Sequence, residues 1–506
     1  MRHSMGPDPG EKEPGIFGSR KASMRIREVR EAIGESVMKH FQRSVVASAA
    51  VACLAIVGWR GLSAQVPADN GMTMALTGDS IITQKLSVHS EPRFVKMIDL
   101  IRGADAAYTN LEMLFHDYEP YPMTQSGGTY MRADPALVKE LVWAGFDIVS
   151  RANNHVNDYG VEGMRLTTKY TAAAGLVQAG VGESLEEARE ARYLDTAKGR
   201  VALISVASTF PDPSRAGRSF GDTRARPGLN PLRFTTTYVV TRQQFDALRI
   251  ALMAAGQLRG GANNAAASQP ATQMNVFGNR FVVGDNQETR TEPLKEDLDE
   301  ITAVVKNASR MADYTIVTFH THEGGADRFS PPQFLTTFAH AVVDAGADIV
   351  SGTGPHVLRG IEIYKGKPIF YCLGDFIFQN ETLLRVPPEN YVPEGLGPGA
   401  GVADFNDKRF NMDRSGFPSD RFIWESVVAM PRFVGKTLAE LKLYPITLGY
   451  QQPRTARGRP MLADPELGSK ILADVTRLSA PLGTTVENKG GVGVVTVHRD
   501  GASGGR

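Results

Sequence analysis

The chain has 506 residues, and its 42% hydrophobic and 22% charged residues are typical of a globular protein with a large core. Its formal net charge of +1 is far from the strongly basic character of nucleic-acid-binding domains, so we expect no nucleic-acid partner. Only two cysteines, Cys53 and Cys372, are present, which excludes a fold that depends on a disulfide framework.

Residues 38–64 have the three parts of a secretory signal. A basic start is followed by an apolar run over 45–58 and by the small residues Ser63 and Ala64. This pattern predicts export to the periplasm or cell surface, with cleavage after Ala64. The apolar run is short for a membrane span, but an uncleaved anchor helix is the alternative, and the membrane would then be contacted only there. Residues 1–37 are expected to be a disordered extension or to precede the true start of translation.

From residue 72 onward, short apolar runs typical of strands alternate with helical stretches. Strands are predicted over 72–78, 106–111, 147–152, 201–207, 314–319 and 348–352. Helices are predicted over 92–104, 134–146, 160–176, 294–312 and 332–347, and the second of these opens with an Asp-Pro pair that suits a helix start. This alternation favours a layered α/β fold.

The alternation is interrupted over 210–291, which we predict to be an irregular insertion with one helix over 241–256. A stretch rich in Pro, Gly and Asn runs from 374 to 417. It is followed by predicted strands over 425–434, 438–448 and 491–497 and a helix over 465–483. We therefore expect an N-terminal extension with a signal or anchor segment over 1–64, one domain over 72–400, and a C-terminal part, 401–506, that completes the same fold.

Polar side chains of the types that bind metals stand at the ends of five predicted strands. Ligands of α/β sheets bind beyond the carboxyl ends of strands, so we expect these residues to meet at one end of one sheet. Taken singly, each has an ordinary explanation, such as a turn or a core histidine; together they favour a site. They are Asp79, Asn110, Glu112, Asn153, Asn154, His155, His320, His322, Glu323 and His356.

Carboxylates, imidazoles and an amide oxygen without thiolates suit divalent ions such as Mn, Fe, Zn or Mg. We expect one or two such ions as cofactors. A pair of ions roughly 3.5–4 Å apart can activate a water molecule and neutralise the charge that develops on a phosphate oxygen.

Five motifs follow one another along the chain: LTGDSI, TNLEM, ANNHVNDYG, FHTHEGG and GTGPHVLRGIEIYKGKPIFYCLGDFIFQN. In order and spacing they resemble the CapA-type capsule-synthesis proteins, which are associated with poly-γ-glutamate and belong to the calcineurin-like metallophosphoesterase superfamily. The resemblance extends over about residues 74–380. It implies a four-layer αββα sandwich with metal ligands on loops at the carboxyl ends of the strands.

The resemblance also implies roles for individual residues. Asp79 matches a metal ligand, Glu112 the bridging carboxylate and Asn154 a ligand of the second metal, and His320 and His356 match the two late ligand positions.

His155, next to Asn154, matches the histidine that protonates a leaving oxygen. Asp158 lies three residues further on and is suitably placed to orient the imidazole of His155.

Three positions depart from the superfamily pattern. Asp79 matches the first residue of the usual Asp-x-His motif, but Ile81 stands in place of the histidine, and CapA-type proteins share this loss. Thr353 and Gly354 stand where a second late histidine is usual, and Asp375 stands where Asn is common. One metal position is then weak or empty unless His322, Glu323 or Asp375 compensates, so we count His322 among the candidate ligands and Glu323 among the candidate catalytic groups.

The sequence thus predicts an exported, metal-dependent hydrolase of phosphoester-like bonds or of bonds in a cell-surface polymer. The alternative is a non-hydrolytic component of capsule assembly that binds anionic polymer and keeps a degenerate metal site. Expected partners are an anionic cell-surface polymer or a phosphoester substrate, and the capsule-synthesis machinery. No stretch of the sequence is dense enough in Lys and Arg to indicate a basic groove, which favours the enzyme.

Overall fold

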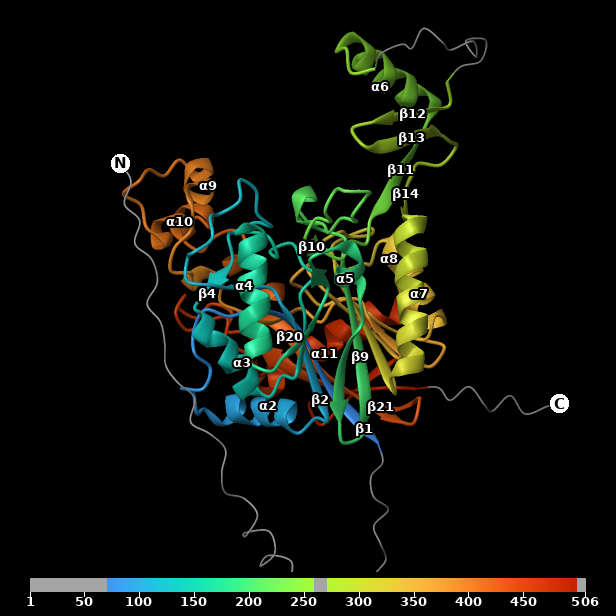
Figure 1. Ribbon diagram of the computed structural model, residues 1–506. Helices are drawn as coiled ribbons and strands as arrows, with labels where there is room; N and C mark the ends of the chain where they lie inside the picture. The colour runs from blue at the N-terminus through green and yellow to red at the C-terminus, as the bar shows by residue number, and fades with distance from the viewer. Residues whose placement is uncertain (1–70, 259–270, 498–506) are drawn as a thin grey trace, which may run out of the picture. The chain divides into compact units, whose positions relative to one another are not determined.

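The computed structural model describes residues 71–258 and 271–497, which belong to a single unit, Asn70–Arg506 (Figure 1). The predicted signal or anchor segment, and the rest of residues 1–64, lie outside the described residues. Among the described residues, no helix is both long enough and apolar enough to cross a membrane.

Two β-sheets form the centre of the described unit. Among the described residues, the first sheet has ten strands: β1 (Met72–Ile81), β2 (Ala106–Leu111), β5 (Ile148–Ser150), β6 (Val177–Ala179), β19 (Asp375–Phe378), β20 (Glu425–Val434), β21 (Thr437–Thr447), β22 (Met461–Leu462), β23 (Val486–Lys489) and β24 (Val492–Val495). Their order is β23-β24-β21-β20-β1-β2-β5-β6, with β19 paired to β1 and β22 to β21.

The second sheet has six strands within the described part of the chain: β8 (Arg192–Thr196), β9 (Gly199–Ala207), β15 (Tyr314–His320), β16 (Ile349–Thr353), β17 (Ile361–Tyr364) and β18 (Lys367–Phe370). Their order is β17-β18-β16-β15-β9-β8. Two short pairs accompany the sheets, β3 (Leu114–Phe115) with β4 (Arg132–Ala133), and β7 (Val181–Gly182) with β10 (Gly228–Leu229).

Helices cover the outer faces of both sheets. They are α2 (Pro92–Arg102), α3 (Val138–Ala144), α4 (Gly160–Ala173), α5 (Leu185–Arg189), α7 (Lys295–Met311) and α8 (Gln333–Asp344), whereas α11 (Pro465–Ser479) packs its apolar side chains into the cluster between the sheets. Figure 1 shows α3 and α4 on one side of the strands and α7 and α8 on the other. The predicted Asp-Pro start is confirmed, since the side chain of Asp134 caps the short 3₁₀ turn Pro135–Leu137 that leads into α3.

The alternation of side chains along the strands explains the layers. Leu76 of β1 and Ile316 of β15 lie in one buried cluster between the two sheets. Their neighbours face outward, Ala75 into the cluster that contains α2 and α3 and Val317 into the cluster that contains α7 and α8. Both faces of the central strands are therefore buried, which explains their continuous apolar runs. The predicted four-layer αββα sandwich is confirmed.

One expectation about these strands is wrong. The five strands that carry the candidate site do not belong to one sheet: β1, β2 and β5 lie in the first sheet and β15 and β16 in the second. Within each sheet these strands are parallel. The order of strands and helices along the chain does not specify which strands pair, so the sequence pattern could not show this division.

The insertion over 210–291 is more regular than expected. It holds a small sheet of order β12-β13-β11-β14 together with α6 (Arg242–Ala254); the strands are β11 (Phe234–Val240), β12 (Gln273–Val276), β13 (Asn279–Val283) and β14 (Glu288–Pro293). Most side chains of these four strands are only partly buried. The strands therefore lack the alternation of apolar and polar residues by which strands are recognised in a sequence. The helix predicted over 241–256 starts at Arg242, with Thr241 as its N-cap in a capping box with Gln244.

The C-terminal part packs against the strands that start the unit. β20 pairs antiparallel with β1, β21 pairs with β20, and the apolar side chains of α11 join the core between the sheets. The stretch between β19 and β20 contains the helices α9 (Pro388–Tyr391) and α10 (Val402–Arg409).

Candidate metal centre

Asp79 lies in β1, beside Asn110 of the neighbouring strand β2, and is completely buried. Its Oδ1 accepts a hydrogen bond of 2.6 Å from Asn110 Nδ2, and its Oδ2 accepts one of 3.0 Å from the backbone N–H of Gly354. Burial by itself raises the pKa of this carboxyl, but the neighbouring imidazoles of His320 and His356 hold it below its usual value. The carboxylate of Asp79 is thus ionised and held in a fixed orientation.

Glu112 follows β2 and is also completely buried. Neither of its carboxylate oxygens has a hydrogen-bond partner among the described residues. Its Oε1 lies 3.6 Å from His320 Nε2 and 3.7 Å from His155 Nε2. Burial and the nearby carboxylates, Asp79 foremost, raise the pKa of Glu112 well above its usual value. A carboxylate in such surroundings stays ionised only when a cation compensates its charge.

The two histidines of the FHTHEGG motif point to the same place. His320 is the last residue of β15, and its Nδ1 lies 3.0 Å from Thr353 Oγ1. Its Nε2 lies 3.2 Å from His322 Nε2. Burial lowers the pKa of both imidazoles, and for His322 the neighbouring His320 lowers it further. Neutral imidazoles are the form that binds metals.

His356 connects the two sheets. Its Nδ1 lies 2.8 Å from Asp375 Oδ1 and 3.8 Å from Asp79 Oδ2, and Asp375 pairs with Asp79 across β1 and β19. His356 has a φ of 56°, a conformation that costs energy for a residue with a side chain. Burial raises the pKa of Asp375 to about 6.

The candidate ligands form two groups that share one residue. Glu112, His320 and His322 form the first group, and Asp79, Glu112 and His356 form the second. Within each group the ligand atoms all lie within 4.8 Å of one another. Glu112 is common to both, as a carboxylate that bridges two ions would be. Together with the unpartnered oxygens of Glu112, this donor set of oxygen and nitrogen atoms fits one or two divalent cations.

The loop after β5 carries Asn154, His155 and Asp158, and all three are buried. His155 Nδ1 lies 2.7 Å from Asp158 Oδ2. Asp158 is itself fixed by two backbone N–H groups, those of Gly127 at 3.0 Å and Met131 at 2.8 Å. The imidazole of His155 is therefore held with its Nε2 toward Glu112.

Within the described part of the chain, the side-chain amide of Asn154 is hydrogen-bonded through its nitrogen but not through its oxygen. Its Nδ2 donates a 3.0 Å hydrogen bond to the carbonyl of Gly127, while its buried Oδ1 has no partner among the described residues. A Cβ atom on Gly127 would lie 2.6 Å from the carbonyl oxygen of Asn154, so the loop requires glycine at this point. The oxygen of Asn154 remains available to a ligand.

Glu323 is a predicted catalytic residue whose carboxylate bonds to neighbouring hydroxyl groups and not to the candidate metal ligands. Its Oε2 accepts hydrogen bonds from the hydroxyls of Ser208 at 2.7 Å and Thr209 at 2.8 Å. Thr209 Oγ1 in turn accepts a 2.8 Å hydrogen bond from the backbone N–H of His322. The contacts of Glu323 thus support the loop that presents His322.

The alternation of side chains explains why His322 and Glu323 differ. His320 and His322 are two residues apart and face the same side, whereas Glu323 bonds to the hydroxyls on the other side together with Thr321. A period of two continuing beyond β15 was the signal in the sequence that could have separated them. Of the three residues proposed as compensating for the missing late histidine, His322 and Asp375 lie beside the ligands.

The missing late histidine also has a structural explanation. Gly354 has a φ of +117°, and a Cβ atom there would lie 2.6 Å from the carbonyl oxygen of Thr321. A histidine side chain does not fit this backbone. Thr353, the other position, faces His320 with its hydroxyl.

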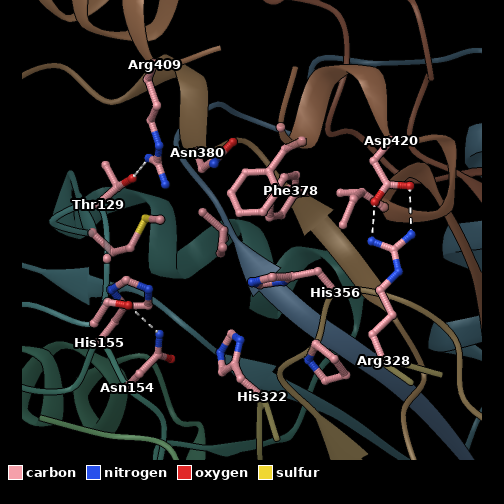
Figure 2. A pocket seen from close by; sticks show the side chains of 18 of the residues that line it. Thr129, Asn154, His155, His322, Arg328, His356, Phe378, Asn380, Arg409 and Asp420 are labelled. Carbon is pink, nitrogen blue, oxygen red and sulfur yellow. Dashed lines mark hydrogen bonds and ion pairs between the residues drawn. The ribbon is translucent and has the colours of Figure 1, made fainter. Parts of the chain in front are cut away.

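A cleft of about 620 Å³ opens over the ligands (Figure 2). Asn154, His155, His322 and His356 line one part of it. Residues that were not predicted also line the cleft, among them Gly127, Gly128, Thr129, Phe378, Asn380, Arg409 and Phe417. Phe378 and Asn380 stand at the end of the longest motif, whereas the others come from a glycine loop and from the stretch after β19, which carry no motif.

The family model described as bacterial capsule synthesis protein PGA_cap matches residues 71–380. The chain belongs to this family. The match ends at Asn380, so Arg409 and Phe417, which also line the cleft, lie beyond the part that defines the family.

Similar proteins extend the comparison. An uncharacterized protein of Sinorhizobium fredii, y4sH, is 36% identical over 449 residues, which cover 84% of this chain and 93% of the relative. The capsule biosynthesis protein CapA of Bacillus anthracis is 25% identical over 317 residues, covering 61% of this chain and 60% of the relative. Among solved structures, Haemophilus influenzae NAD nucleotidase aligns with a TM-score of 0.26 and 8% identity, over 80% of this chain and 56% of that one, which is too weak to support an inference.

Proposed function

We propose that this PGA_cap protein is an exported, metal-dependent hydrolase of phosphoester-like bonds or of bonds in an anionic cell-surface polymer. The observation that carries the proposal is Glu112, whose two buried oxygens have no partner among the described residues and which belongs to both groups of candidate metal ligands. The names of the Bacillus relatives, which refer to capsule and PGA biosynthesis, support a role in the synthesis of a capsule polymer.

The proposed cofactor is one or two divalent metal ions. His320, His322 and Glu112 would hold one ion, and Asp79, Glu112 and His356 the other. The unpartnered oxygens of Asn154 and Asp375 are further candidates. When bound, the ions would stabilise the negative charge that develops on a phosphoryl oxygen.

His155 is the group proposed to move a proton. With Nδ1–H directed at Asp158, the imidazole presents Nε2 to the cleft, where a protonated ring can give its proton to a leaving oxygen. Asp158 fixes the orientation of this ring. Asn154, on the same loop, would bind and orient the reacting group.

Metal removal tests the proposal directly. We expect the purified chain to contain one to two equivalents of a divalent ion and to hydrolyse simple phosphomonoesters or diesters. Dialysis against a chelator should abolish the hydrolysis, and one of Mn²⁺, Fe²⁺, Zn²⁺ or Mg²⁺ should restore it. Bound metal without hydrolysis of any phosphoester or capsule polymer would instead favour the alternative, a polymer-binding assembly component.

Export is a separate part of the proposal and rests on residues 38–64. We expect protein recovered from cells that express the full sequence to lie outside the cytoplasm and to begin near Gln65, because the small residues before it suit signal cleavage. N-terminal sequencing of the fractionated protein provides the measurement. Protein in the cytoplasmic fraction that retains residues 38–64 would contradict export, whereas retention of this segment in the membrane fraction would indicate the uncleaved anchor.

A further inference from the structure

The wall of the cleft opposite Asn154 and His155 carries a cation with no acidic partner in contact. Arg409, the last residue of α10, lines the cleft, and its guanidinium donates a hydrogen bond to the hydroxyl of Thr129 (Figure 2). Within residues 71–258 and 271–497, no carboxylate forms an ion pair or hydrogen bond with Arg409. By contrast Arg328, which also lines the cleft, is bound to Asp420 through both terminal nitrogens. Arg409 is thus free to bind an anion from the solution.

Arg409 is partly buried and packs among three aromatic rings. Its guanidinium lies 5.0 Å from the ring centre of Phe410, 5.6 Å from that of Phe405 and 5.7 Å from that of Phe417. Burial lowers the pKa of this guanidinium, while the charges of Glu394 and Glu381 act in the opposite direction. A fixed and partly desolvated guanidinium binds an anion more strongly than one that moves freely in solvent.

Asn380 gives an independent indication of a ligand at this wall. Its side chain lines the same cleft and is only 3% exposed, yet its Oδ1 finds no hydrogen-bond partner among the described residues. Figure 2 shows Asn380 and Arg409 on the same side of the cleft. A buried amide oxygen without a partner is costly, and the amide can turn either its oxygen or its two N–H groups to a bound molecule.

From these observations we infer that Arg409, Asn380 and Thr129 form a second anion-binding subsite, which takes a carboxylate or phosphate group of the substrate remote from the bond that is cleaved. This inference rests on the proposed function, which places the bond that is cleaved at the candidate metal ligands. It adds that the substrate carries at least two anionic groups, one near the candidate metal ligands and one at Arg409, and that simple monoesters use only part of the cleft.

A matched pair of esters tests the subsite. Phenyl phosphate and 4-carboxyphenyl phosphate share the reacting group and differ by one remote carboxylate. We expect the carboxylated ester to have the lower KM with the parent chain. Arg409→Gln should remove this advantage, raising the KM of the carboxylated ester about 10- to 100-fold and leaving phenyl phosphate nearly unchanged, because a charge-assisted hydrogen bond is lost for only one of the two.

The neighbouring residue provides the control. Lys408 is exposed and does not line the cleft, so Lys408→Gln removes the same charge without touching the subsite and should leave both KM values unchanged. Equal effects of Arg409→Gln on the two esters, or no preference of the parent chain for the carboxylated ester, would overturn the subsite while leaving the hydrolase intact.

Binding without turnover separates this inference from the proposed function. Calorimetric titration with glutarate, a small dicarboxylate, should show binding to the parent chain and to Lys408→Gln and at least tenfold weaker binding to Arg409→Gln. If no ester were hydrolysed but this difference were found, the hydrolase would fail and the subsite would stand. If glutarate bound equally to all three chains, or to none, the subsite would be wrong.

Discussion

Replacing Glu112 with alanine is expected to remove more bound metal than any other single substitution in the chain. Glu112 belongs to both groups of candidate ligands, whereas His322 belongs to one and His356 to the other. His322→Ala and His356→Ala should therefore each lose at most about one equivalent, and Glu112→Ala should lose nearly all. Metal analysis of the purified variants after identical dialysis makes the comparison. Full metal content in Glu112→Ala would rule out the bridging role.

Glu112→Gln separates loss of metal from loss of fold. Glutamine keeps the shape of the side chain but removes a buried charge that burial and neighbouring carboxylates already disfavour. We expect the metal-free variant to be at least as stable as the metal-free parent in thermal unfolding. The parent should gain stability when metal is added, and the variant should gain little, because only the parent binds the ion tightly. A variant that unfolds at a markedly lower temperature than the metal-free parent would show that Glu112 has a structural role instead.

The second large effect concerns His155. His155→Ala is expected to keep its metal but to lose about 10²–10⁴-fold in turnover, the usual range for a lost acid–base group. The loss should be much smaller for 4-nitrophenyl phosphate than for phenyl phosphate, because a good leaving group needs no proton. Steady-state rates on the two esters, together with metal analysis, provide the measurement. Loss of metal would make His155 a ligand, and equal rate losses on both esters would exclude the role of general acid.

Asp158→Asn should show a milder form of the same pattern. Asp158 accepts hydrogen bonds from Gly127 and Met131 with separate oxygens and contacts His155 with one of them. Asparagine has only one acceptor oxygen, so it cannot keep all three contacts. The imidazole of His155 would remain but would be less well oriented. If Asp158→Asn and His155→Ala both kept the parent's activity on every ester, the loop after β5 would be only a polar turn.

The sequence by itself determined most strands and helices of the two-sheet core and selected the candidate site residues. Strands and helices follow from apolar periodicity and caps, which are local, and the strands predicted over 106–111 and 314–319 lie within one residue of β2 and β15. The ends of strands are equally local features, so Asp79, Glu112 and His320 could be selected before any contact was known. The four-layer sandwich followed from resemblance, since local patterns do not specify pairing.

Only the tertiary structure decided which strands pair and which polar residues meet. The carboxyl ends of β1 and β2 in one sheet lie beside those of β15 and β16 in the other, which brings Glu112 to His320 across 3.6 Å. The tertiary structure also separates His322 from Glu323, adjacent residues whose side chains point to opposite sides. In addition, the tertiary structure brings Arg409 to the cleft from a segment without a motif. Such contacts depend on the packing of segments far apart in the chain, and a single sequence records local periodicity but not that packing.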